Sequence, residues 1–195
     1  MIYTVVTPPS VEPVSLTEVK QHLRLTATGE EGVYTAEDDK LNIFIQAARE
    51  QVEFITRRAL NTQTWKIFID RWPMSNELTL PFPPLISVTH VKYYETDDTE
   101  NTFTDYGVGT GDPGRIVLDY GYVWPSKTLR PLNPIEIQFV AGYGATSASV
   151  PESIRSAILM LVGHLYENRE LTSMANMIEV PFAVNALLAS YRWFI

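Results

Sequence analysis

The spacing of apolar residues changes twice along the chain and divides it into helical, strand-rich and again helical parts. Between Leu41 and Ala59, apolar residues recur at intervals of three and four positions, which places them on one face of an α-helix. The same spacing recurs between Ile154 and Leu165, where further apolar residues widen the face. These patterns predict two long helices, the first of about 20 residues, each with a buried face.

The ends of the helices carry recognisable capping residues. Ser15–Glu18 matches the capping box, so we expect a short helix from there to about Leu25. A threonine followed by three acids over Thr35–Asp39 is typical of a helix start, because the helix dipole favours negative charge there. Pro151 fits the first position of the second long helix, and Pro181 fits the start of a last, shorter one.

Between the two helical parts the hydrophobic period falls to two. Apolar and other residues alternate over Trp65–Asp70 and over Ile135–Ala141, which predicts β-strands with one buried face. Further runs rich in β-branched or aromatic residues predict strands over Glu77–Leu80, Val88–Tyr94, Thr102–Val108 and Arg115–Leu118. Turn residues separate these runs and leave no room for crossover helices, so the strands are expected to be antiparallel.

Together these elements predict an α+β fold. We expect mainly a helical bundle of about four helices, formed by residues 14–60 and 150–192. An antiparallel β insertion over residues 63–143 interrupts the bundle, and all 195 residues form a single domain. Residues Thr26–Thr35 and Asn168–Val180 are predicted to be loops.

Composition narrows the range of possible functions. The chain has 45% hydrophobic residues, including 10 Tyr, 8 Phe and 4 Trp, which is enough to form a core. It has no cysteine, which excludes disulfides and thiolate nucleophiles. No apolar run is long enough to cross a membrane, and Met1–Val6 lacks the features of a signal peptide. We therefore expect no membrane contact and no export by the usual route.

The charge balance argues against tight binding to nucleic acid. The chain has 15 basic and 23 acidic residues and a net charge of −8. Binding to the phosphate backbone needs clustered Lys and Arg, but Arg57-Arg58 is the only adjacent basic pair. An acidic surface along which DNA passes without specific binding is compatible with this composition.

Candidate catalytic groups are sparse. His164 and Glu167 have the spacing of two metal ligands on one helix face, but no second such pair exists among the 3 histidines. The acidic clusters Glu37–Asp39 and Asp97–Glu100 do not match a Ca²⁺-binding loop, and Gly107–Gly111 lacks the lysine of a phosphate-binding loop. We therefore assign no catalytic, cofactor-binding or metal-binding residue and expect no cofactor.

The apolar second long helix and the aromatic end of the chain point to protein contacts. Burying each of the last three side chains, Trp193, Phe194 and Ile195, is worth roughly 1.5–3 kcal/mol. They pack either on the last helix of the same chain or on a partner. The candidate interface set comprises Arg155, Ile158, Leu161, Leu165, Tyr166, Arg169, Arg192, Trp193, Phe194 and Ile195.

Eight blocks of sequence, in this order, carry a resemblance to a known family. They are Val14–Arg24 (VSLTEVKQHLR), Ala47–Glu53, Leu60–Trp65, Leu80–Val88, Val140–Gly144, Val150–Arg155, His164–Glu170 and Pro181–Leu188. In this order they resemble the gp6-like head–tail connector proteins of tailed phages, also called adaptor or head-completion proteins, in the longer form with a β insertion.

The resemblance implies a structural protein of a phage or prophage virion, present in the host cytoplasm during assembly, with no catalytic residues. In that family a ring of about a dozen copies docks below the portal, extends the DNA channel and receives a tail-side completion or stopper protein. The helix after Pro151 would pack on the Leu41–Ala59 helix of its own chain or of the next copy. The loop Leu171–Val180 and the aromatic end would reach the portal or a tail protein.

Two other functions remain open at this point. One is a tail-completion protein or another minor virion structural protein. The other belongs to a different class, a small metal-dependent hydrolase that uses His164 and Glu167.

Overall fold

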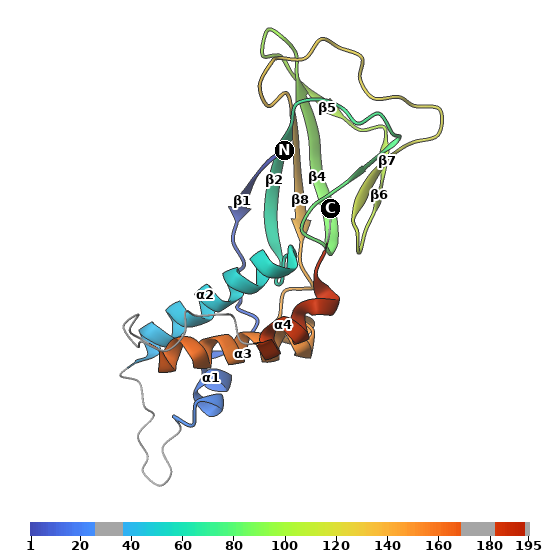
Figure 1. Ribbon diagram of the computed structural model, residues 1–195. Helices are drawn as coiled ribbons and strands as arrows, with labels where there is room; N and C mark the ends of the chain where they lie inside the picture. The colour runs from blue at the N-terminus through green and yellow to red at the C-terminus, as the bar shows by residue number, and fades with distance from the viewer. Residues whose placement is uncertain (26–36, 169–181, 194–195) are drawn as a thin grey trace. The chain divides into compact units, whose positions relative to one another are not determined.

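The computed structural model describes residues 1–25, 37–168 and 182–193 (Figure 1). The chain forms a strand unit, Met1–Ser10 with Thr62–Tyr143, and a helical unit, Val11–Asn61 with Gly144–Ile195. The predicted α+β class is confirmed. The prediction that the chain is mainly a helical bundle is wrong, because the structure has 33% helix and 30% strand. Two of the four described α-helices are only seven residues long, whereas the strand part builds two sheets.

The strand unit contains a five-stranded sheet and a three-stranded sheet, in which all neighbouring strands are antiparallel. In spatial order, the larger sheet consists of β1 (Ile2–Thr7), β2 (Gln63–Ile69), β8 (Ile135–Ala141), β4 (Leu85–Tyr94) and β5 (Glu100–Phe103). The smaller sheet consists of β3 (Glu77–Thr79), β7 (Arg115–Leu118) and β6 (Tyr106–Gly109).

Most predicted strands are present, with two differences. The alternating runs form β2 and β8, which confirms these two strands. The predicted single strand Thr102–Val108 is wrong, because the chain turns after Phe103 and continues in the other sheet. The turn is closed by the Tyr106 N–H, which donates to the Thr104 carbonyl at 2.9 Å. Strand β1 was not predicted, because Ile2–Thr7 has no alternation of apolar and polar residues.

The two faces of the larger sheet differ in polarity. On one face Ile67, Ile137 and Val91 are fully buried. On the other face Glu136 accepts contacts from two neighbouring strands, at 2.8 Å from Lys66 Nζ and 3.0 Å from His90 Nε2. Burial opposes ionisation of this carboxyl, but the bonds from Lys66 and His90 outweigh it and lower the pKa of Glu136. The sheet thus has one apolar face and one charge-paired face.

The helical unit is built around two long helices that pack on each other in the same chain. Its helices are α1 (Leu16–His22), α2 (Asp38–Thr56), α3 (Glu152–Glu167) and α4 (Phe182–Leu188), with 3₁₀ turns at Ser147–Ser149 and Ala189–Tyr191. Helix α3 packs on both α2 and α4. Leu41, Ile45, Val52, Ile154 and Ile158 are almost fully buried, which confirms the predicted core faces.

The capping box at Ser15 is confirmed, whereas the placement of Pro151 at the first helical position is wrong by one residue. The Glu18 N–H donates to Ser15 Oγ at 3.2 Å, and the Ser15 N–H donates to Glu18 Oε2 at 2.7 Å, as in a capping box. Helix α1 ends at His22, earlier than predicted, and Arg24 has a left-handed φ of 56°. Pro151 precedes the first helical residue because its ψ of 138° is extended. The predicted cap Thr35, the start at Pro181 and most of both predicted loops lie outside the described residues.

None of the described helices combines the length and the apolar character that a membrane crossing requires.

Candidate functional site

The helical unit carries the described members of the candidate interface set, and the first of them, Arg155, is engaged within the chain. Its guanidinium donates to the Pro13 carbonyl at 3.1 Å and to Glu152 at 2.6 Å, and it pairs with Glu18. The Ser15 backbone N–H lowers the pKa of Glu18 despite partial burial, and Arg155 adds to this effect. Arg155 therefore fastens the start of α1 to α3.

Four further members lie along α3. Ile158 and Leu161 are 0% and 6% exposed in the unit's own core. Leu165 and Tyr166 are half-buried, and the Tyr166 hydroxyl donates to Glu37 Oε2 at 2.8 Å. The buried pair has little surface to offer a second chain, so the half-buried pair is better placed for such a contact.

The remaining members belong to the last part of the chain. Arg192 is exposed and donates to Asn185 Oδ1 at 2.9 Å, next to the described end of the chain. The Trp193 N–H donates to the Thr56 carbonyl at 2.9 Å, so this backbone lies against the end of α2. Arg169, Phe194 and Ile195 lie outside the described residues. The interface set as a whole stays a prediction.

The surface of α2 that faces away from the core is a further candidate, which the sequence pattern did not predict. Ile43 and Phe54 are each 64% exposed, and Ala47 and Glu50 lie between them on the same side. We call these four residues the α2 outer stripe. The 11-residue separation of Ile43 and Phe54 corresponds to about three helical turns, so both side chains point the same way. The spacing of Ile43 and Phe54 was the sequence signal for this surface. It was missed because the core residues on the opposite face of the helix form a stronger apolar pattern.

Phe54 has a cationic neighbour at the end of the stripe. The Arg57 guanidinium carbon lies 5.0 Å from the centre of the Phe54 ring, within the range of a cation–π interaction. Phenylalanine and arginine are both among the residue types enriched at protein–protein interfaces. The α2 outer stripe is therefore a candidate protein-binding surface.

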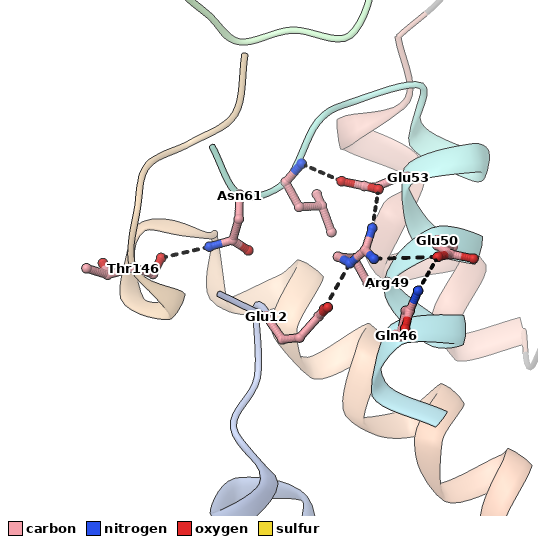
Figure 2. A network of polar contacts seen from close by, with 8 residues as sticks. Glu12, Gln46, Arg49, Glu50, Glu53, Asn61 and Thr146 are labelled. Atoms are coloured by element: carbon pink, nitrogen blue, oxygen red, sulfur yellow. Dashed lines mark hydrogen bonds and ion pairs between the residues drawn. The ribbon is translucent and has the colours of Figure 1, made fainter. Parts of the chain in front are cut away.

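A charged network around Arg49 holds α2 in place (Figure 2). Arg49, 6% exposed, lies 2.9 Å from Glu12, 2.9 Å from Glu53 and 3.5 Å from Glu50. Glu53 also accepts the Leu60 N–H at 3.0 Å. Three carboxylates around one guanidinium tie α2 to the segment before α1 and to the segment after α2. The network therefore gives the α2 outer stripe a rigid support.

The catalytic candidates from the sequence show no converging arrangement among the described residues. No group of three His, Asp or Glu side chains in that part of the chain is placed to hold a metal ion. His164 Nδ1 lies 3.2 Å from the Asn168 amide. Asp38 and Asp39 lie in the first turn of α2, and Asp97 Oδ1 accepts the Thr99 N–H at 3.1 Å within the turn between β4 and β5. Both acidic clusters thus have local structural roles.

Comparison with known proteins identifies structural relatives but no sequence family. No protein-family model matches the chain, and no curated protein matches it. A chain from the neck of an empty gene transfer agent (GTA) particle, computed with C6 symmetry, is similar with a TM-score of 0.82 and 26% identity. A chain from the virion of the native GTA particle gives 0.80 and 25%. Both comparisons cover 100% of this chain and 97% of the other.

A third solved structure has the same fold. It is a chain from the neck of the native GTA particle computed with C12 symmetry, with a TM-score of 0.77 and 24% identity over 100% of this chain. The strand unit and the helical unit thus occur together in chains of an assembled particle.

Proposed function

We propose that this chain is a virion structural protein, a subunit of the head–tail connector ring in the neck of a phage or phage-like particle. The observation that carries the proposal is the likeness to chains of GTA particles along the full length of both partners, 100% and 97%. A match of this extent includes both units, which we propose to work together as one connector domain over residues 1–195. The chain would then belong to the connector family that its sequence resembles.

Ring formation gives the exposed apolar surface of the helical unit a role. Every copy in a ring must offer two different faces to its neighbours, because the contact is head-to-tail and closes by rotation. The GTA neck structures were computed with C6 and C12 symmetry, which supports a ring of about a dozen copies for this chain. The α2 outer stripe and the exposed members of the interface set are the proposed contact residues.

The remaining parts of the proposal concern partners and chemistry. The ring would dock below the portal protein and present a site for a tail-side completion or stopper protein. With a net charge of −8, the chain would let DNA pass through the channel without specific binding. We propose no enzymatic activity. The protein would work in the virion and be present in the host cytoplasm during assembly.

Electron microscopy of the purified chain, alone and with the portal protein of the same phage or prophage, tests this function. We expect rings, or portal particles carrying one additional ring. Monomers that form neither species at high micromolar concentration would contradict the proposal. Affinity capture separates a connector, which retains the portal, from a tail-completion protein, which retains only tail components.

A further inference from the structure

Strand β1 leaves one edge of the five-stranded sheet open. It pairs with β2 on one side, and no backbone hydrogen bond among the described residues joins its other side to any element. All six of its residues are exposed, including Ile2 at 51%, Tyr3 at 48% and Val5 at 45%. Alternate residues of such a strand direct their N–H and C=O groups outward, where they can pair with another strand.

Two other sheet edges in the strand unit, β5 and β3, carry charged residues, and β1 carries none. The β5 edge carries Glu100, whose carboxylate lies 2.6 Å from Lys92 Nζ. The β3 edge carries Glu77, 3.5 Å from Arg115. Charged residues and prolines normally prevent edge strands from pairing with other chains. Ile2–Thr7 contains neither, so this edge is suited to accept a strand.

A second uncharged edge exists on the opposite side of the same unit. Strand β6, Tyr106–Gly109, is the outer strand of the three-stranded sheet and contains two glycines and Val108, which is 39% exposed. Strand β6 has four residues, the same number as Ile2–Val5, the part of β1 that pairs with β2 without a shift in register. Within the strand unit β1 and β6 lie at opposite sides (Figure 1).

We propose that β1 of one copy pairs with β6 of the next copy, so that the sheets of neighbouring subunits join. Two different edges at opposite sides of one unit provide the head-to-tail contact that a closed ring requires. The glycines of β6 permit a close backbone approach, and Val108 adds an apolar contact for Tyr3 or Val5. This inference rests on the proposed ring function, and it names a second copy of this chain as the partner of β1.

Two threonines provide a matched pair of variants. Thr4 in β1 and Thr102 in β5 are both exposed, and each lies opposite a lysine, Lys66 or Lys92, in its own sheet. A glutamate at either position therefore has a cation nearby in its own chain and places one charge on one edge. We expect Thr4→Glu to raise the concentration for half-maximal ring assembly about tenfold or more, and Thr102→Glu to change it less than about twofold. Both variants should retain the thermal stability of the parent chain.

Crosslinking tests the contact directly, because the chain contains no cysteine. With a bis-maleimide reagent, assembled Thr4→Cys/Val108→Cys protein should give a ladder of covalent oligomers. Thr4→Cys/Thr102→Cys protein should give none. Two results together would overturn this inference and leave the proposed function intact. The Thr4→Glu protein would form rings as the parent does, and rings of the Thr4→Cys/Val108→Cys protein would give no ladder. If the parent chain forms no ring with or without the portal, both the proposed function and this inference fail.

Discussion

Individual arginines in the helical unit join segments that are far apart in the sequence. Arg155 in α3 binds the Pro13 carbonyl and Glu18 near the start of α1. Arg49 in α2 binds Glu12 and Glu53. The planar guanidinium donates in several directions at once, so one side chain can satisfy several acceptors. These residues position the backbone that supports the candidate interface.

Glu18 should make stability depend on pH. Its pKa is lowered from 4.5 in the folded chain, so the unfolded chain binds the proton more readily. The resulting stabilisation is fully present above about pH 4.5 and is lost as the pH falls through the folded pKa. Glu18→Gln should flatten the acid side of the stability curve, as measured by urea unfolding at pH values on both sides of 4.5. An acid slope equal to that of the parent chain would contradict this assignment.

Removing Arg49 should destabilise the helical unit. Arg49→Met would leave Glu12, Glu50 and Glu53 without their shared cation. Because the carboxylates are partly solvated, we expect a loss of about 2–4 kcal/mol in the free energy of unfolding. Arg57→Met, at an exposed position, is the control and should cost less than about 1 kcal/mol. If chemical denaturation gave the same loss of unfolding free energy for Arg49→Met and Arg57→Met, the network would not stabilise the helical unit more than an exposed arginine does.

At the scale of helices and strands, the local sequence pattern predicted which face of an element is buried better than it predicted which strands pair with each other. The alternation in β2 and β8 correctly indicated two strands with a buried apolar face. Nothing local indicated that β2 and β8 pair with each other, or that β1 joins them. The break between β5 and β6 was also missed, because strand-favouring residues stand on both sides of it, Thr102 and Phe103 before and Tyr106 and Val108 after. Strand pairing depends on distant residues, which a local pattern does not contain.

Gly114 shows how closely two segments of the strand unit approach each other. A Cβ atom at this position would lie 2.1 Å from the Leu85 Cβ, so Gly114→Ala requires the backbone to move. We expect a loss of about 2–3 kcal/mol in the free energy of unfolding. Gly121 has a φ of +87° but open space around it, so Gly121→Ala should cost only about 1 kcal/mol. Thermal and urea unfolding of both variants would show this order, and the reverse order would contradict the close packing at Gly114.

At the scale of the whole molecule, the chain combines two units that each expose large apolar side chains. The helical unit presents the α2 outer stripe, and the strand unit presents the β1 edge. Exposed apolar side chains that form one contiguous patch mark surfaces that bind other proteins. The predicted set from α3 includes Ile158 and Leu161, which are buried in the helical unit itself. Helix α2 therefore offers more contact surface than the sequence alone indicated.

The α2 outer stripe should contribute to assembly without contributing to folding. Ile43→Ser/Phe54→Ser removes two side chains that are each 64% exposed, so thermal unfolding of the monomer should change little. If the stripe is a ring contact, the concentration for half-maximal assembly should rise about tenfold or more. Asn42→Ser, exposed on the same helix but off the stripe, is the control. Sedimentation velocity or electron microscopy measures both, and unchanged assembly of the double variant would exclude the stripe as a contact.

The sequence by itself determined the two long helices and their core faces, the capping box at Ser15, the faces of β2 and β8, the absence of cysteine and the acidic charge. These features depend on residues close together in the chain, so periodicity and composition are sufficient to read them. The tertiary structure decided which strands share a sheet, that β1 forms an open edge, and that Ile43 and Phe54 remain exposed. Those outcomes depend on contacts between segments that are far apart in the sequence. A local pattern does not contain the information that decides among alternative contacts of this kind.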